Sequence, residues 1–168
     1  MSPTSPEHTK VKQQNQTHSN GEDETPAALQ HYPVIYSQVV QWGEMDALNH
    51  LNNVVYYRYA ESARIHYLQA LDLFESGAML LAHSSCQYLR PVTYPDTLLI
   101  GLRCQRLGTT SMIIEYSYYS QQQQEVVAEA EAVIVRLNNN SEHKLPWTAK
   151  ERSRLLALEA QFDHTPEH

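Results

Sequence analysis

One acidic side chain and the residues after it suggest chemistry on a carbonyl group. Asp46 stands in the segment from Gly43 to Asn53, which is rich in Gly, Asp and Asn as loops are. The Asn52-Asn53 pair closes this segment and favours a helix start there. A carboxylate can attack a carbonyl carbon or activate water for that attack. Unpaired N–H groups in the first helical turn, with the positive end of the helix dipole, can hold the resulting oxyanion.

Each of these polar residues also has a purely structural interpretation. Asp46 could form an Asx turn that only stabilises the loop. His50 lies four residues further on, and its imidazole could position water or the leaving group, or be an ordinary hydrogen-bonded loop histidine. Asn52 could orient a substrate, although turns favour such residues as well.

The elements that must position these residues can be predicted from the pattern of apolar residues. A strand is expected from Tyr32 to about Trp42, and the run from Val54 to Leu71 has no Gly or Pro and predicts a long helix that is apolar on nearly all sides and therefore buried. Four more strands follow without an intervening helix, so the fold class is α+β with one antiparallel sheet around one helix. Their expected ranges are 84–89, 97–107, 111–119 and 125–137.

Three finer features of this pattern bear on the domain organisation. Alanines 128, 130 and 132 form a small-residue face on which a helix could pack closely, and four glutamines from Gln121 to Gln124 predict a hairpin turn. Residues 1–31 lack an apolar pattern and predict a disordered tail. The folded domain is then 32–140, and 141–168 form a C-terminal extension with a short helix between Pro146 and Gln161.

Bulk composition excludes several classes of protein. A net charge of −7 argues against a general nucleic-acid binder, which needs clustered Lys and Arg. The longest apolar run is Ala78 to Ala82, whereas a membrane span needs about 20 residues. Cys86 and Cys104 are expected to be small buried side chains without a disulfide, and the nine histidines lack metal-ligand spacing. We therefore expect a cytoplasmic protein without metal or other cofactor.

Several segments together resemble the hotdog-fold acyl-CoA thioesterases, specifically the 4-hydroxybenzoyl-CoA thioesterase-like group. These segments are residues 42–64, 85–92, 94–96 and 107–111, within a resemblance that covers about 33–140. The family fold is a long helix embraced by an antiparallel sheet, which agrees with the expected elements. The resemblance implies hydrolysis of an acyl thioester to a free acid and coenzyme A. It also implies a homodimer or homotetramer with active sites at the subunit interface.

The resemblance assigns roles to individual positions. Asp46 matches the loop aspartate that acts as nucleophile or general base, and Asn53 matches the residue whose backbone N–H polarises the thioester carbonyl, a helix cap being its structural alternative. Tyr57 could line an acyl tunnel, although tyrosines on this helix also suit core or interface packing. The remaining candidates for substrate binding are Asn52, Arg90, Thr109 and Ser111.

Two features bear on which carrier holds the acyl group, and the second departs from the family pattern. Arg90 could meet a coenzyme A phosphate or be a solvated charge at a strand end. The turn from Gly108 to Ser111 resembles the family's pantetheine-contacting turn, but Thr110 stands where a basic residue is common. Thioesters of acyl-carrier protein are therefore an alternative substrate.

Three other interpretations of the site stay open at this point. Glu61 is a rival carboxylate, because one hotdog lineage uses a helix acid, but its spacing to Arg64 favours an ordinary ion pair. A non-catalytic acyl-binding domain would keep the pocket without hydrolysis. A hotdog dehydratase is disfavoured, because His50 and Asp46 do not reproduce its arrangement of His and acid.

Overall fold

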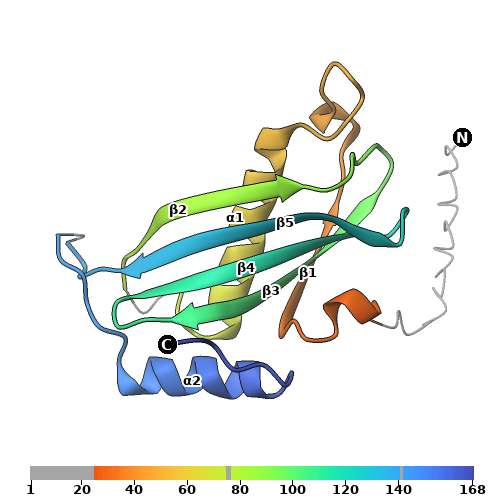
Figure 1. The fold of residues 1–168 in the computed structure, drawn as a ribbon. Coiled ribbons are helices and arrows are strands. Elements are labelled where there is room, and N and C mark those ends of the chain that lie inside the picture. The colour runs from red at the N-terminus through yellow and green to blue at the C-terminus, as the bar shows by residue number, and fades with distance from the viewer. Residues whose placement is uncertain (1–24, 75–76, 141) are drawn as a thin grey trace, which may run out of the picture.

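One antiparallel sheet packs against one long helix (Figure 1). The computed structural model describes residues 25–74, 77–140 and 142–168. Spatial strand order is β1-β3-β4-β5-β2, so β1 and β2 form the two edges. The α+β prediction is confirmed, with β1 (Val34–Val39), α1 (Asn53–Ala70), β2 (Met79–Tyr88), β3 (Thr97–Leu107), β4 (Ser111–Ser120), β5 (Glu125–Arg136) and α2 (Ala149–Ala160) in chain order.

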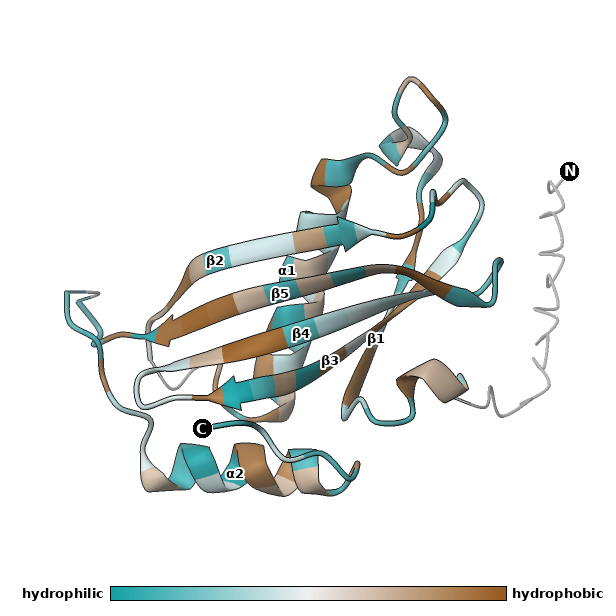
Figure 2. Ribbon diagram, in the orientation of Figure 1, coloured by the Kyte–Doolittle hydropathy of each residue, from teal (hydrophilic) through white to brown (hydrophobic). Residues whose placement is uncertain are grey.

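The core lies between α1 and one face of the sheet. Alternate residues of the central strands point toward α1 and are almost fully buried, among them Ile100 and Cys104 of β3 and Ile114 and Tyr118 of β4. Figure 2 shows the apolar ends of β4 and β5 side by side, where Met112 pairs with Ile134. The alternation in the sequence therefore identifies the buried face.

Helix α1 comes closest to β1 and β3 rather than to β5, so the prediction that the alanines of β5 let a helix approach closely is wrong, although two of them are buried. Ala128 is 0% exposed and Ala132 is 1% exposed. The helix itself is buried only on the side that faces the sheet, so the expectation of burial on nearly all sides is wrong. Val54 is 73% exposed, because no other element of the described chain covers the outer side of α1.

Several element boundaries differ from the prediction. Strand β1 is shorter than the expected range of 32–42, because Trp42–Glu44 form a 3-10 helix and do not continue the strand. Strand β2 begins at Met79, five residues before the expected start, because Leu80 and Leu81 lie on an exposed edge and their side chains do not alternate with polar ones. Residues 27–29, expected in the disordered tail, form a short 3-10 helix (Ala27–Leu29) with Leu29 fully buried. A single buried leucine leaves no periodic signal in a sequence, and the rest of the expected tail up to residue 24 lies outside the described residues.

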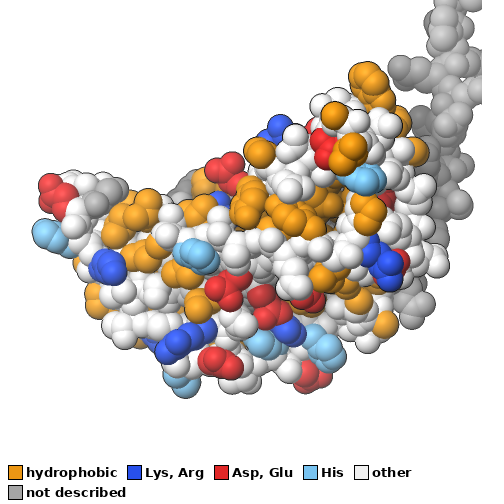
Figure 3. Space-filling view, turned by 45° about the horizontal axis from the view of Figure 1, so that its top comes forward, with side chains coloured by type: hydrophobic (Ala, Val, Ile, Leu, Met, Phe, Trp, Pro, Cys, Tyr) orange, Lys and Arg blue, Asp and Glu red, His pale blue; other side chains and the backbone are white. Residues whose placement is uncertain are grey.

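Strand β2 leaves a hydrophobic edge uncovered. Leu80 is 53% exposed, Leu81 43% and Leu89 45%, and Tyr57 of α1 adds another exposed ring at 41%. Figure 3 shows apolar side chains gathered along this side of the molecule. Such an edge also presents unpaired backbone groups, which makes it a template for pairing with a further strand. No helix in the described part of the chain is long and apolar enough to cross a membrane.

The C-terminal extension closes the end of the molecule opposite the start of β3. Helix α2 begins with a capping box between Thr148 and Glu151, and the residues after it run beside β3, where Leu107 N donates to Glu167 O at 2.8 Å. Glu159 of α2 is 0% exposed. Its Oε1 accepts hydrogen bonds from Tyr67 Oη at 2.5 Å and Cys104 N at 2.8 Å, which joins α2 to both α1 and β3.

Gly101 is the point where the segment before β1 packs onto the outer face of the sheet. A Cβ atom at this position would lie 2.7 Å from Tyr32 Cγ and 2.9 Å from Leu29 Cδ2. We predict that Gly101→Ala lowers the free energy of unfolding by about 1–3 kcal/mol, because the added methyl overpacks this contact. Urea unfolding measures the change. Gly43→Ala is the matched control, because a Cβ there meets nothing within 4 Å, and equal stability of the two variants would contradict the packing argument.

The buried acid Glu159 predicts a specific pH dependence of stability. Burial raises its pKa above the ordinary 4.5, against the opposing effect of its bonds to Tyr67 and Cys104. An acid with a raised folded-state pKa contributes stability at low pH that is lost as pH rises through that pKa. Glu159→Gln keeps the acceptor without the charge, so its melting temperature relative to wild type should rise between pH 4.5 and pH 8. A difference that does not change with pH would contradict the burial argument.

Candidate active site

The loop between β1 and α1 is organised around the Asp46 carboxylate. Oδ1 of Asp46 accepts hydrogen bonds from Leu48 N at 2.8 Å and from His50 N at 3.0 Å. Asp46 N donates to His50 O at 2.7 Å, and Asn49 adopts a left-handed conformation with φ of 59°. The structural interpretation of Asp46, a turn-stabilising aspartate, is therefore correct as far as Oδ1 is concerned.

The second carboxylate oxygen of Asp46, Oδ2, has no partner in the described structure. Within residues 25–74, 77–140 and 142–168, Oδ2 forms no hydrogen bond or ion pair. Bonds from the backbone N–H groups of His50 and then of Leu48 lower the pKa of Asp46 below 3.8. The side chain is consequently ionised at neutral pH and offers one unpaired, partly exposed oxygen.

Helix α1 begins directly after this loop and leaves its first amide unpaired. Asn52 is the N-cap, and its Oδ1 accepts from Val54 N at 3.0 Å, so the interpretation of Asn53 as the cap is wrong by one residue. The Asn53 amide has no acceptor among the residues that the structure describes. An unpaired N–H at the positive end of an 18-residue helix is a ready donor to an oxyanion.

A clamp that sequence reasoning missed fixes the loop to the helix. Glu44 accepts from Gln41 N at 2.9 Å, forms an ion pair with Arg58 and accepts a hydrogen bond from Tyr59. Its carbonyl oxygen also accepts from Asn52 N at 3.0 Å. Arg58 and Tyr59 stand more than a dozen residues from Glu44, so no local spacing indicates this contact.

His50 is held in place by its backbone rather than by its ring. Its N–H and C=O both bond to Asp46, and the half-buried imidazole forms no hydrogen bond within the described chain. The ring is therefore close to Asp46 in sequence and space but has no partner that fixes its tautomer.

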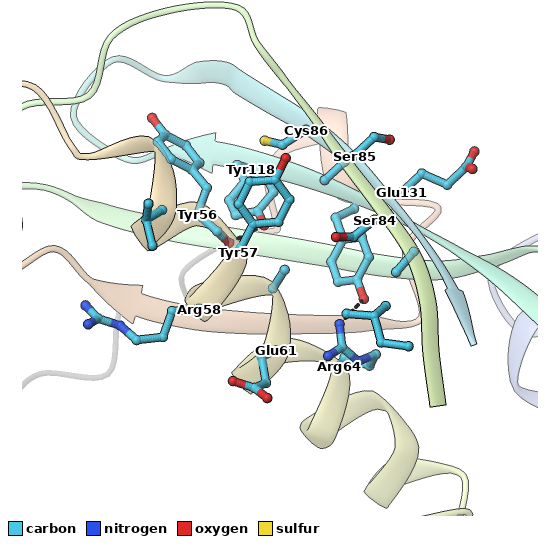
Figure 4. Close-up of a pocket in the computed structure, with 16 residues that line it drawn as sticks. Tyr56, Tyr57, Arg58, Glu61, Arg64, Ser84, Ser85, Cys86, Tyr118 and Glu131 are labelled. Carbon is cyan, nitrogen blue, oxygen red and sulfur yellow. Dashed lines mark hydrogen bonds between the residues drawn. The ribbon is translucent and has the colours of Figure 1, made fainter. Parts of the chain in front are cut away.

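A cavity of about 330 Å³ begins beside the helix start and runs along α1 (Figure 4). Tyr57 lines it, as does Val54, the residue after Asn53. Cys86 also faces it, but burial raises the pKa of this thiol to about 11, so it stays protonated and is a poor nucleophile at neutral pH. The remaining lining is mostly apolar and includes Tyr56, Ala60, Leu81, Tyr118, Ala130 and Ala132.

Arg90 lies at the same end of the sheet as the Asp46 loop. Leu51 N donates to Val92 O at 2.8 Å, which fixes the segment after β2 against that loop. Arg90 forms an ion pair with Glu125 at 2.7 Å, and both side chains are well exposed. A phosphate would have to compete with this pair.

Thr109 and Ser111 do not meet Asp46 within one chain. Thr109 lies in the turn after β3 and Ser111 begins β4, whereas the Asp46 loop lies at the start of β3, where Val40 N bonds to Asp96 O. The 11 residues of β3 span roughly 35 Å. A contact of these two residues with the same substrate would require a second subunit.

Glu61 lies at the rim of the cavity without the expected partner. Glu61 and Arg64 form no ion pair in the described structure, although their spacing favours one. Glu61 is exposed, and Figure 4 shows its carboxylate pointing away from the cavity. This geometry favours Asp46 over Glu61 as the reacting acid.

Solved structures with a similar fold include thioesterases. A thioesterase of Thermus thermophilus, crystallised with coenzyme A and zinc, is 32% identical to this chain with a TM-score of 0.70, covering 77% of this chain and 97% of that one. The PA5185 protein of Pseudomonas aeruginosa is 30% identical with a TM-score of 0.68, covering 77% and 94%. The gentisyl-coenzyme A thioesterase BH1999 is 22% identical, and its TM-score of 0.65, with coverage of 73% and 99%, supports the shared hotdog fold alone.

Sequence comparison agrees with the structural comparison. YsmA of Bacillus subtilis, a protein of uncharacterized function, is 28% identical over 120 residues, which cover 70% of this chain and 81% of YsmA. The family model described as the thioesterase-like superfamily matches residues 40–155, which include the Asp46 loop, α1 and all strands from β2 to β5. The chain therefore belongs to the thioesterase-like superfamily and has its hotdog fold.

Proposed function

We propose that this protein hydrolyses an acyl thioester of coenzyme A to the free acid and the thiol. The observation that supports this most is that one loop and the helix start after it carry two groups without a partner in the described structure, the Asp46 Oδ2 and the Asn53 amide. One is a negative oxygen that can deliver electrons to a carbonyl carbon. The other is a donor that can receive the negative charge on the carbonyl oxygen.

The reaction follows from these two groups. Asp46 Oδ2 removes a proton from water while the water oxygen attacks the thioester carbon, or attacks that carbon itself to form an anhydride that water then opens. In both cases the carbonyl oxygen becomes an oxyanion that accepts a hydrogen bond from Asn53 N. Collapse of the tetrahedral intermediate breaks the C–S bond and releases the thiolate of coenzyme A.

Flanking residues have supporting roles in this proposal. The His50 imidazole can donate a proton to the departing sulfur, since no other contact in the described chain engages it. Asn52 Oδ1 holds the helix start, so its contribution to substrate binding is indirect. Tyr57 contacts the acyl group from the wall of the cavity. A volume of about 330 Å³ lies at the low end of small-molecule sites and suits a short chain or a single ring.

A homodimer completes the site. The exposed edge of β2 can pair with β2 of a second copy, which extends the sheet and covers Leu80, Leu81 and Leu89. The cavity lies beside this edge, so a second subunit would form its other wall. The turn with Thr109 and Ser111 would then reach the substrate only from that subunit.

The carrier of the acyl group is coenzyme A in this proposal. The similar thioesterase of Thermus thermophilus holds coenzyme A, which supports a free acyl-CoA over an acyl-carrier protein. Arg90 can contact a phosphate if its exposed pair with Glu125 opens, at small energetic cost for a surface ion pair.

The first test removes only the charge of Asp46. Asp46→Asn retains an oxygen that can accept from Leu48 N and His50 N, so the loop should keep its shape. We predict that kcat for acyl-CoA hydrolysis falls by about 10²- to 10⁴-fold with an unchanged melting temperature, because general-base or nucleophilic action is lost. Thiol release from a panel of short, long and aromatic acyl-CoA esters measures it.

Asp163→Asn is the matched control for this experiment. Asp163 is an exposed aspartate after α2 and far from the loop in sequence, so its amide variant should keep full activity. An Asp46→Asn variant as active as wild type would refute the mechanism. Acyl-CoA binding without hydrolysis by wild type would instead identify a non-catalytic acyl-binding domain.

The proposed dimer leads to a second prediction, about oligomeric state and activity. Leu80→Lys places a charge on the exposed edge of β2 and should convert a dimer, with twice the chain mass of 19.3 kDa, into a monomer with reduced activity. Light scattering after size-exclusion chromatography measures the mass. Val39→Lys, on the opposite edge strand, is the control and should remain dimeric. A wild-type monomer with full activity would contradict the shared site.

A further inference from the structure

A positive charge faces the apolar cavity deeper along α1. Arg64 lies ten residues beyond Val54, about 15 Å further along the helix axis, and its side chain is half-buried. Helical side chains lean toward the helix N-terminus, so the guanidinium reaches back toward the mouth of the cavity. Figure 4 shows it beneath the aromatic rings that line the space.

This guanidinium has no acidic partner within the described chain. Its one polar contact is a long one, 3.4 Å from Arg64 Nη1 to Tyr116 Oη. Two other half-buried arginines have acidic partners, since Arg103 pairs with Glu115 at 2.5 Å and Arg136 with Glu151 at 3.2 Å. A charge that is partly removed from water is stabilised when it is paired, so Arg64 is suited to an anion from outside the chain.

The acidic residues that border the cavity do not supply that anion. Glu131 is paired across the sheet with Glu115 and Ser85, which lie on the face turned away from α1. Figure 4 shows the carboxylates of Glu131 and Glu61 both pointing away from Arg64. Arg58, the other cation on the lining, is already paired with Glu44.

Tyr116 supplies a second donor at the same place. Its ring is 2% exposed, and its hydroxyl oxygen accepts from Arg64 while its own proton has no acceptor among the described residues. Burial raises the pKa of Tyr116, so it keeps that proton. A carboxylate could receive two hydrogen bonds from the planar guanidinium fork and a further one from the phenol.

We propose that Arg64 and Tyr116 select an acyl group that ends in a carboxylate, so that the substrate is the coenzyme A monothioester of a short dicarboxylic acid. This inference rests on the proposed thioesterase function and names its substrate class. The thioester lies at the Asn53 amide, the methylene chain lies against the apolar wall, and the distal carboxylate meets Arg64. The small cavity volume limits the chain to a short one.

Matched pairs of esters test this selection. Glutaryl-, adipyl- and suberyl-CoA are compared with pentanoyl-, hexanoyl- and octanoyl-CoA, so that each pair differs only in the distal carboxylate. Wild type should show a kcat/KM at least tenfold higher for the carboxylate member of the best pair. Arg64→Met, which replaces the guanidinium with a shorter, unbranched and uncharged side chain, should lower kcat/KM for that member by about 10- to 100-fold. For the ester without the distal carboxylate, kcat/KM should change less than about threefold, which also shows that the fold is intact.

Binding measurements test the selection of a carboxylate separately from the proposed hydrolysis. Titration calorimetry with the Asp46→Asn protein should show tighter binding of the carboxylate ester, and addition of Arg64→Met should remove the difference. Tyr116→Phe should reduce the preference partly. Equal affinities for both members of every pair, or a preference that survives Arg64→Met, would overturn the role of Arg64. Absence of any turnover by wild type would overturn the proposed hydrolysis but leave the binding result valid.

Discussion

The close packing of α1 on the inner face of the sheet is the contact on which the rest of this structure depends. The helix approaches β1 and β3 most closely, and this packing fixes where its N-terminus and its flank lie. The N-terminus then projects at the end of the sheet where the Asp46 loop is attached. The flank leaves a cavity between the helix and the β2 side of the sheet. Ala130 and Ala132 of β5 line that cavity, so larger side chains at these two positions would fill it.

The structural and catalytic interpretations of Asp46 are compatible, because they use different oxygens. Oδ1 accepts two backbone hydrogen bonds that shape the turn, while Oδ2 has no partner in the described structure. The same bonds lower the pKa of Asp46, so they also keep the reactive form charged. Glu44 adds a second constraint by connecting the loop to Arg58 and Tyr59 of α1. A preorganised acid of this kind needs little rearrangement when a substrate arrives.

Most of the fold and the centre of the site could be predicted from sequence, because both rest on local signals. Alternation defined β3 from Thr97 to Leu107 correctly, and the Asn pair marked the helix start to within one residue. The early start of β2 could not be seen, because strand pairing and not burial holds its exposed residues. Contacts between distant residues, such as Glu44 with Arg58 or Glu159 with Tyr67, likewise have no signature in spacing. The missing partner of Arg64 was hidden by a favourable spacing to Glu61 that the folded helix does not use.

The most direct measurement of the central claim is a crystal structure with a ketone analogue, in which a methylene group inserted between the carbonyl and the sulfur of coenzyme A prevents hydrolysis. The account predicts that the carbonyl oxygen lies within about 3.2 Å of Asn53 N. It also predicts that Oδ2 of one subunit's Asp46 faces the carbonyl carbon on the side opposite to the Asn53 amide. A carbonyl bound elsewhere, with the Asn53 amide unoccupied and Asp46 turned away from it, would contradict the assignment of this loop and helix as the active site.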